Sequence, residues 1–211
     1  MPNFKKGLKM SKKEIWLNSG FTAESVKLVR DSIIDTSNKD KYVPIIVYIN
    51  SYGGSVDALN VLIDTFNEVP NEIITVCLGT AMSAGAVLLS CGNKRFVGKN
   101  ARIMIHEVSS WAMGTTTELK HSLVETTRMN RQLLKIIAKN TKKSLKELMK
   151  IFKDTPDFYL TAQEAVKFGI ADYIGVPSVI ETPVYHVVID NKKLLTNDVK
   201  KKKIVKRGKK R

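Results

Sequence analysis

The feature that most constrains the fold is a stretch of 21 residues without a single charge, residues 73–93. A helix of that length would be long enough to cross a bilayer. Its first half, however, is rich in β-branched residues and its second half in Ala and Leu, and Gly79 and Gly85 interrupt it. A buried strand followed by a buried helix fits this pattern better, so we expect no membrane span.

The same strand-loop-helix arrangement occurs earlier in the chain. Residues 43–49 are almost continuously apolar, which is typical of a parallel strand covered on both faces. A polar and Gly-rich loop follows at residues 50–54, and a helix is expected over residues 55–68, before Pro70. Together with a short strand at residues 14–17 and a helix at 22–34, this pattern predicts an α/β fold with right-handed crossovers.

The second half of the chain is dominated by one long helix, expected over residues 116–139. Short strands are expected before it, at residues 95–97 and 102–105, with another extended segment at 108–113. The helix carries one apolar stripe on an otherwise polar surface, so it either packs across its own domain or projects to meet another subunit.

Two shorter helices are marked by their capping residues. Ser144 precedes Glu147 by three positions, and Thr161 precedes Glu164 by the same spacing, which is the signature of a capping box. Gly169 is the expected end of the second of these helices.

The net charge of +15 is concentrated at one end of the chain. Residues 190–211 hold eleven Lys and Arg against two Asp, which leaves +6 for the other 189 residues. This segment has no aromatic side chain to stack on bases, so we expect a solvated, disordered tail and no specific nucleic-acid binding.

The cysteines and the N-terminus favour a cytoplasmic protein. Cys77 and Cys91 both lie in apolar runs, where they are expected to be small core residues of a reducing compartment rather than a disulfide or metal ligands. The first 17 residues are basic and lack the apolar segment of a secretory signal.

Three loops at the carboxyl ends of predicted strands carry the residues that could do chemistry. The first loop, residues 51–54, ends in paired glycines whose N–H groups could stabilise an oxyanion, although a plain turn explains them too. In the second, Ser83 stands where an apolar helix begins. It is either a nucleophile favoured by the helix N-terminus or an N-cap.

The third loop begins with His106, at the end of a predicted strand. It is a better candidate for a general base than His121, in the polar long helix, or His186, near the basic tail. Asp154 or Asp157 could orient its imidazole, and a lone His also has a purely structural interpretation.

Four segments together resemble a known family: INSYGGS (49–55), AMSAGAVLLSCGNKRF (81–96), ARIMIHE (101–107) and DFYLTAQEAVKFGIAD (157–172). In order and spacing they look like the ClpP family, the proteolytic subunit of the Clp protease, over residues 14–175. The resemblance implies a ClpP/crotonase-like fold of repeated β-β-α units with a protruding handle helix. It also implies Ser83 as nucleophile, His106 as general base, Asp157 as orienting acid, and the N–H groups of Gly54 and Ala84 as the oxyanion hole.

What the family does sets the functional expectation. The resemblance implies a serine endopeptidase that cleaves unfolded polypeptides through an acyl-enzyme, with no metal and no cofactor. Family members form heptameric homo-oligomeric rings, usually stacked in pairs around a chamber and served by a ring ATPase. We expect a basic lead at residues 1–13, the protease domain at 14–176, an extension at 177–189 and the tail at 190–211.

The chain departs from the family pattern at several places. Tyr52 replaces the usual Pro, and Ala84 the usual Met. The segment from Asp154 to Asp157 is one residue shorter than usual and has Pro156 where family members often have an Arg. Because that Arg helps to pair two rings, the resemblance does not decide between a single and a double ring. The N-terminus is short for the family, so the resemblance does not decide whether a ring ATPase binds. With its basic C-terminal extension, the chain is similar to the ClpP-like proteases of phage head assembly.

The residues alone are also compatible with three other functions. A Ser-Lys dyad would pair Ser83 with Lys120 or Lys135 of the long helix. A crotonase-like acyl-CoA enzyme would use the oxyanion donors without a nucleophilic serine. An inactive ring subunit would keep the residues without their geometry.

Overall fold

The computed structural model describes residues 14–178 and has a sheet of seven strands at its centre. Five parallel strands lie in the order β1-β2-β3-β4-β7, β5 runs parallel to the end of β3, and β6 is antiparallel to β5. The strands are β1 (Ile15–Leu17), β2 (Ile45–Ser51), β3 (Ile73–Met82), β4 (Lys94–Val97), β5 (Arg102–His106), β6 (Asp157–Leu160) and β7 (Tyr173–Ile174).

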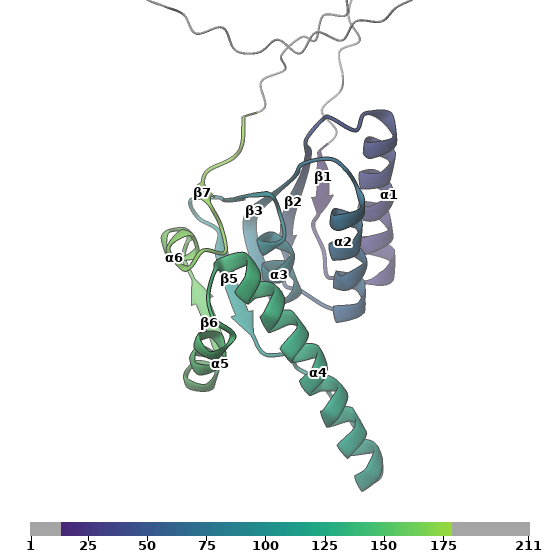
Figure 1. The fold of residues 1–211 in the computed structure, drawn as a ribbon, viewed down its shortest axis with the longest axis vertical. Coiled ribbons are helices and arrows are strands. Elements are labelled where there is room, and N and C mark those ends of the chain that lie inside the picture. Colours follow the sequence, from purple (N-terminus) through teal and green to yellow (C-terminus); the bar gives the residue numbers. More distant parts are fainter. Residues whose placement is uncertain (1–13, 179–211) are drawn as a thin grey trace, which may run out of the picture. The chain divides into compact units, whose positions relative to one another are not determined.

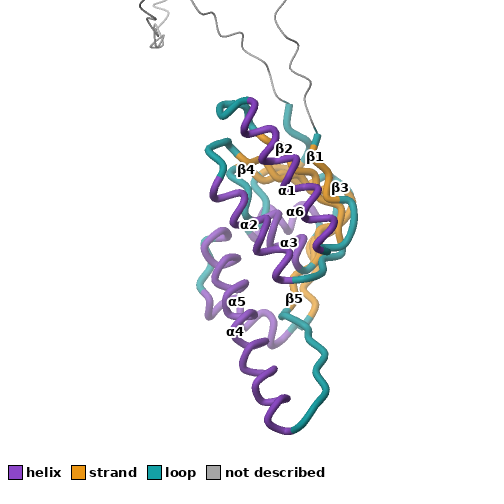
Figure 2. The backbone as a smooth tube through the Cα atoms, turned by 90° about the vertical axis from the view of Figure 1, so that its right-hand side faces the viewer, coloured by secondary structure: helices purple, strands orange, loops and turns teal. Residues whose placement is uncertain are grey.

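Six helices accompany the sheet, and α1, α2 and α3 lie together on one side of it (Figure 2). The predicted α/β architecture is therefore present. The helices are α1 (Ala23–Lys39), α2 (Val56–Glu68), α3 (Ala84–Ser90), α4 (Thr116–Thr141), α5 (Leu145–Asp154) and α6 (Ala162–Phe168).

The uncharged stretch forms β3 and α3, as predicted. Every residue of α3 is buried, which explains why the sequence keeps charge out of it. Strand β3 is longer than expected, because its end pairs with β5 after its first half has paired with β2 and β4. Among the helices of residues 14–178, none combines the length and apolar composition that a membrane span needs.

The two faces of the sheet are buried in different ways. Alternate residues such as Val47 and Ile49 of β2 join the core formed with the helices. The opposite face holds a smaller cluster of Ile46, Tyr48, Ile74 and Val76, which contains only strand residues. There the ring of Trp16 stacks on Tyr48, with ring centroids 4.5 Å apart. The expectation of burial on both faces is thus correct, but helices supply it on one face only.

Helix α4 leaves the body of the protein, as Figure 1 shows in green. Its buried residues all lie in its last third, namely Leu133, Leu134, Ile137 and Thr141. Of the two arrangements that its apolar stripe allowed, the structure has the projecting one, with only the C-terminal end docked on the sheet domain.

The helix starts agree with the capping signals, whereas some of the other predicted elements differ from the structure. Capping boxes begin α5 at Ser144 and α6 at Thr161, and Gly169 ends α6 in the left-handed conformation with φ 93°. Residues 108–113, expected to be extended, pair with no strand and form a loop alongside α4. Strands β6 and β7 were not predicted, and α1 continues to Lys39 rather than ending near Ile34.

Arg95 of β4 ties the C-terminal elements together. Its guanidinium donates to the carboxylate of Asp172 and to the carbonyl oxygens of Asn140 and Gly169, at the ends of α4 and α6. Burial of Asp172 acts to raise its pKa, but the hydrogen bonds and the charge of Arg95 outweigh it and hold the pKa below its ordinary value. The bidentate pair thus links β4 to Asp172, just before β7, and the same guanidinium holds the C-terminal ends of α4 and α6.

Cys77 is a core residue, as expected, and Cys91 is partly buried and packs against the core. They are free thiols, and burial raises the pKa of Cys77 to about 12 and that of Cys91 to about 11. The predicted basic lead at residues 1–13 and the tail at 190–211 lie outside the described residues, as does nearly all of the extension at 177–189.

Candidate active site

Ser83 lies at the sharp turn between β3 and α3 and has the backbone angles φ 54° and ψ −121°. Residues other than Gly rarely adopt this conformation, so it must be held by the surrounding structure. The N–H of Ser83 donates to the carbonyl of Met104 in β5, at 2.8 Å. Although Ser83 is the N-cap of α3, its side chain makes no capping hydrogen bond, which leaves the hydroxyl available.

That hydroxyl is hydrogen-bonded to His106, the last residue of β5. Its Nε2 lies 2.8 Å from the Oγ of Ser83. Strand β5 pairs with the end of β3 just before Ser83, with Met82 opposite Met104, so the sheet itself brings the two side chains together. The distance is that of a hydrogen bond between a hydroxyl and its general base.

Asp157 lies on the other side of the imidazole. It is the first residue of β6 and stands directly opposite His106 in the antiparallel pairing with β5. Its Oδ1 is 3.8 Å from Nδ1 of His106, which is longer than a hydrogen bond, and 59% of its side chain is exposed. Asp154, the alternative, is the last residue of α5.

The glycine loop packs directly against Ser83. A Cβ on Gly53 would lie 2.7 Å from the Cβ of Ser83, and one on Gly54 would lie 2.7 Å from the carbonyl oxygen of Phe21. Only glycines fit these two positions, at φ 102° and φ 147°. Within residues 14–178, neither Gly54 nor Ala84 donates its N–H to another backbone group outside the regular elements.

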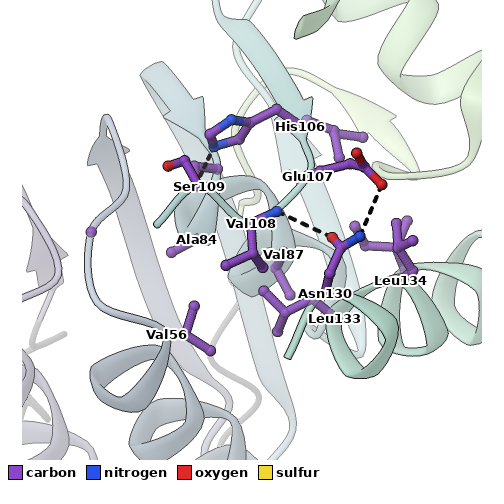
Figure 3. Close-up of a pocket in the computed structure, with 14 residues that line it drawn as sticks. Val56, Ala84, Val87, His106, Glu107, Val108, Ser109, Asn130, Leu133 and Leu134 are labelled. Atoms are coloured by element: carbon purple, nitrogen blue, oxygen red, sulfur yellow. Dashed lines mark hydrogen bonds between the residues drawn. The ribbon is translucent and has the colours of Figure 1, made fainter. Parts of the chain in front are cut away.

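A small cavity of about 50 Å³ opens between these groups and α4. Ser83, His106, Gly54 and Ala84 all contribute to its lining. The rest of its wall comes from α2, α3, the end of β5, residues 107–109 and α4. Apolar side chains such as Val56, Val87, Leu133 and Leu134 form much of it, and Glu107, Ser109 and Asn130 are its polar part (Figure 3). Ser83, His106, Gly54 and Ala84 thus line one cavity that has both apolar and polar walls.

The competing candidates lie elsewhere. Lys120, Lys135 and His121 are exposed on α4 and are absent from the lining of the cavity, while His186 lies outside the described residues. Among residues 14–178, no group of three His, Cys, Asp or Glu side chains is placed to hold a metal ion.

Two polar residues of this site, Glu107 and Asn130, were not predicted from the sequence. Asn130 of α4 lines the cavity, accepts a hydrogen bond from the N–H of Val108 and donates one to the carboxylate of Glu107 (Figure 3). A signal for it was present in the sequence. Asn130 shares a helix face with Leu133, Leu134 and Ile137, and a polar residue on an otherwise buried face has a partner elsewhere in the fold.

The family model described as Clp protease matches residues 6–178, which is well over half of the chain. The match contains every residue of the arrangement described above.

Proposed function

The chain belongs to the Clp protease family and is a ClpP-like peptidase, and from that premise we propose that it is a serine endopeptidase that uses Ser83, His106 and Asp157. One observation carries the proposal, the 2.8 Å distance between Nε2 of His106 and Oγ of Ser83. A serine that only capped α3 would donate or accept within its own helix, and this one does not.

The first half of the reaction forms an acyl-enzyme. Ser83 Oγ attacks the carbonyl carbon of the scissile peptide bond while Nε2 of His106 accepts the hydroxyl proton. The N–H groups of Gly54 and Ala84 donate to the oxyanion that develops. His106 then gives its proton to the leaving amine as the carbon–nitrogen bond breaks.

The second half uses the same groups on water. Nε2 of His106 removes a proton from a water molecule that attacks the acyl carbon, and the second oxyanion occupies the same two N–H donors. Collapse of this intermediate releases the carboxyl product and returns the proton to Ser83. Asp157, facing Nδ1 of His106, stabilises the imidazolium in both halves.

The cavity supports a preference for substrates with a small apolar side chain before the scissile bond. Its interior is lined by Val56, Val87, Leu133 and Leu134, and its volume is modest. We therefore propose unfolded polypeptides as substrates, since a folded protein rarely presents such a side chain in an extended segment.

Oligomeric assembly is part of the proposal, as an expectation from the family. The projecting half of α4 supports it, because Leu123 and Val124 expose 67% and 60% of their surface there. Exposed apolar side chains on a helix without an intramolecular partner are suited to contact another subunit. We propose homo-oligomeric rings that enclose the catalytic sites, served by a ring ATPase.

A fluorophosphonate probe tests the catalytic proposal, because it reacts with activated serines. The purified full-length protein is incubated with the probe, and the adduct is located by mass spectrometry and compared with hydrolysis of a fluorogenic peptide. We expect labelling of Ser83 and no labelling in Ser83→Ala or His106→Ala. Ser19→Ala, a change of an exposed serine, is the matched control and retains both activities. Labelling elsewhere, or peptide hydrolysis that survives Ser83→Ala, would contradict the proposal.

A further inference from the structure

The chain that follows His106 is held against α4 by side chains one helical turn apart. We call residues 107–114 the strap; Figure 2 shows it as part of the loop between β5 and the start of α4. The Oγ atoms of Ser110 and Thr126 are 3.0 Å apart, which fixes the middle of the strap. Asn130, four residues further along α4, fixes its beginning.

Asn130 uses both ends of its amide for this contact. Its Oδ1 accepts from the N–H of Val108 at 3.1 Å, and its Nδ2 donates to Oε1 of Glu107 at 2.9 Å (Figure 3). The amide is planar, so two bonds of opposite polarity fix the position and the orientation of the backbone at residues 107 and 108. Asn is also a poor helix former, and here it stands in the middle of a helix of 26 residues. Its side chain bonds to residues 107 and 108 and not to the backbone of that helix.

The position of this backbone matters for the imidazole of His106. Its Nε2 is hydrogen-bonded to Ser83, but its Nδ1 is 3.8 Å from Asp157, so a hydrogen bond holds the ring on one side only. The ring therefore depends on the main chain that carries it. On the N-terminal side, pairing of β5 with β3 and β6 fixes that chain, and on the C-terminal side Asn130 does.

We propose that Asn130 is a positioning residue for the reaction, which holds residues 107 and 108 so that His106 stays aligned on Ser83. The inference rests on the proposed function. Asn130 itself touches neither reacting atom. Small displacements of a catalytic base lower rates steeply, by up to about 100-fold for 1 Å. We expect Asn130→Ala to slow the chemical step by at least about tenfold.

The reversal of donor and acceptor gives the sharpest test. In Asn130→Asp, the carboxylate still accepts from the Val108 N–H but faces the carboxylate of Glu107, so the strap is pushed away. In the double variant Asn130→Asp with Glu107→Gln, the side-chain amide at position 107 donates to the carboxylate at position 130. The pairing is then restored with reversed polarity. The double variant is therefore expected to recover most of the rate that Asn130→Asp loses, while Glu107→Gln alone keeps an amide pair.

The measurements are the rate of fluorophosphonate labelling at Ser83, kcat and KM on a peptide, and amide hydrogen exchange at residues 107–109. Asn140→Ala is the matched control, because Asn140 is also an amide on α4 that links two elements, through Ser90, but lies outside the cavity. We expect Asn130→Ala to lower the labelling rate and kcat and to speed exchange at Val108. Asn140→Ala should change none of these.

Three outcomes would overturn the inference. If wild-type protein labels but Asn130→Ala labels equally fast, Asn130 has no role in alignment, whatever happens to exchange. If the double variant is folded and no faster than Asn130→Asp, the paired amide is not the cause. If wild-type protein fails to label at all, the proposed function fails and takes this inference with it, which separates the two cases.

Discussion

Nδ1 of His106 lies 3.8 Å from Oδ1 of Asp157, across an antiparallel strand pair in which the two residues stand directly opposite each other. The antiparallel register alone aims the carboxylate at the ring. Because the carboxylate is more than half exposed and beyond hydrogen-bond distance, its attraction for the imidazolium is screened by water.

Asp157→Asn should therefore lower kcat less than the loss of a buried triad aspartate, which costs about 10,000-fold. Because screening weakens the interaction, we expect kcat to decrease by roughly 10- to 100-fold. KM should change little. Asp154→Asn, three residues earlier at the end of α5, is the matched control and should retain full activity. Peptide hydrolysis by the two variants checks the assignment, and the opposite ranking would make Asp154 the orienting acid.

Gly54→Ala should remove activity by displacing an oxyanion donor. The added Cβ would lie 2.7 Å from the carbonyl oxygen and 2.8 Å from the N atom of Phe21, both of them backbone atoms, so the loop must shift. Loss of one donor costs about 100- to 1,000-fold in kcat, and the strained φ costs about 1–3 kcal/mol of stability.

The control for the glycine variant is Gly20→Ala. There the closest contact of the new Cβ is 3.4 Å, and the backbone is not in the left-handed region. Circular dichroism with thermal unfolding verifies that Gly54→Ala is folded at the assay temperature, and kcat on a peptide is then compared. A folded Gly54→Ala variant with normal kcat would exclude the Gly54 N–H from the oxyanion hole.

Asp172 should make stability depend on pH through its contact with Arg95. Its pKa is lowered from an ordinary value of 3.8, so the carboxylate stabilises the fold fully above about pH 3.8. The contribution is lost as the pH falls further, through the lowered pKa of the folded state. We expect the difference in unfolding free energy between wild-type protein and Asp172→Asn to be constant from pH 5 to 7 and to shrink below about pH 4.

Urea unfolding at each pH measures this difference. Asp35→Asn is the control, because the Asp35 carboxylate is 62% exposed and, among residues 14–178, pairs only with Lys39 on the surface of α1. A difference for Asp172→Asn that stays the same at pH 3 would show that the carboxylate charge is not what holds the C-terminal elements together.

The projecting half of α4 should carry a subunit contact. Replacing both Leu123 and Val124 by Asp puts two charges on an exposed apolar surface of the helix, so any assembly that buries this surface should dissociate. Sedimentation velocity is expected to show a smaller particle for the double variant. Tyr42→Asp, a change in a loop where the side chain is 94% exposed, should leave the particle size unchanged. A double variant of unchanged size would place the contacts elsewhere.

Much of the fold could be predicted because it depends on local patterns. Apolar runs marked the central strands, and the capping boxes at Ser144 and Thr161 marked the helix starts, since each signal lies within a few residues. Strand β7 escaped notice because it is only two residues long, and β6 because four residues before a capping box carry no clear alternation.

The sequence also indicated Ser83, His106 and the glycine loop as candidates, because each follows a predicted strand of a parallel sheet. It left open what the hydroxyl of Ser83 does, since an N-cap and a nucleophile occupy the same position before a helix. The residues alone left Asp154 and Asp157 both open, since both come shortly before the same capping box, and only the resemblance to the family favoured Asp157.

The amino-acid sequence by itself determined the central strands, most of the helices and the loops at the carboxyl ends of those strands, because these properties depend on neighbours along the chain. Only the tertiary structure decided that Ser83 bonds to His106 rather than to its own helix, and that Asp157 rather than Asp154 faces the imidazole. It also decided that Asn130 holds the strap. These contacts join residues more than 20 positions apart, and strand register and helix docking, which bury apolar surface throughout the domain, set which of them form.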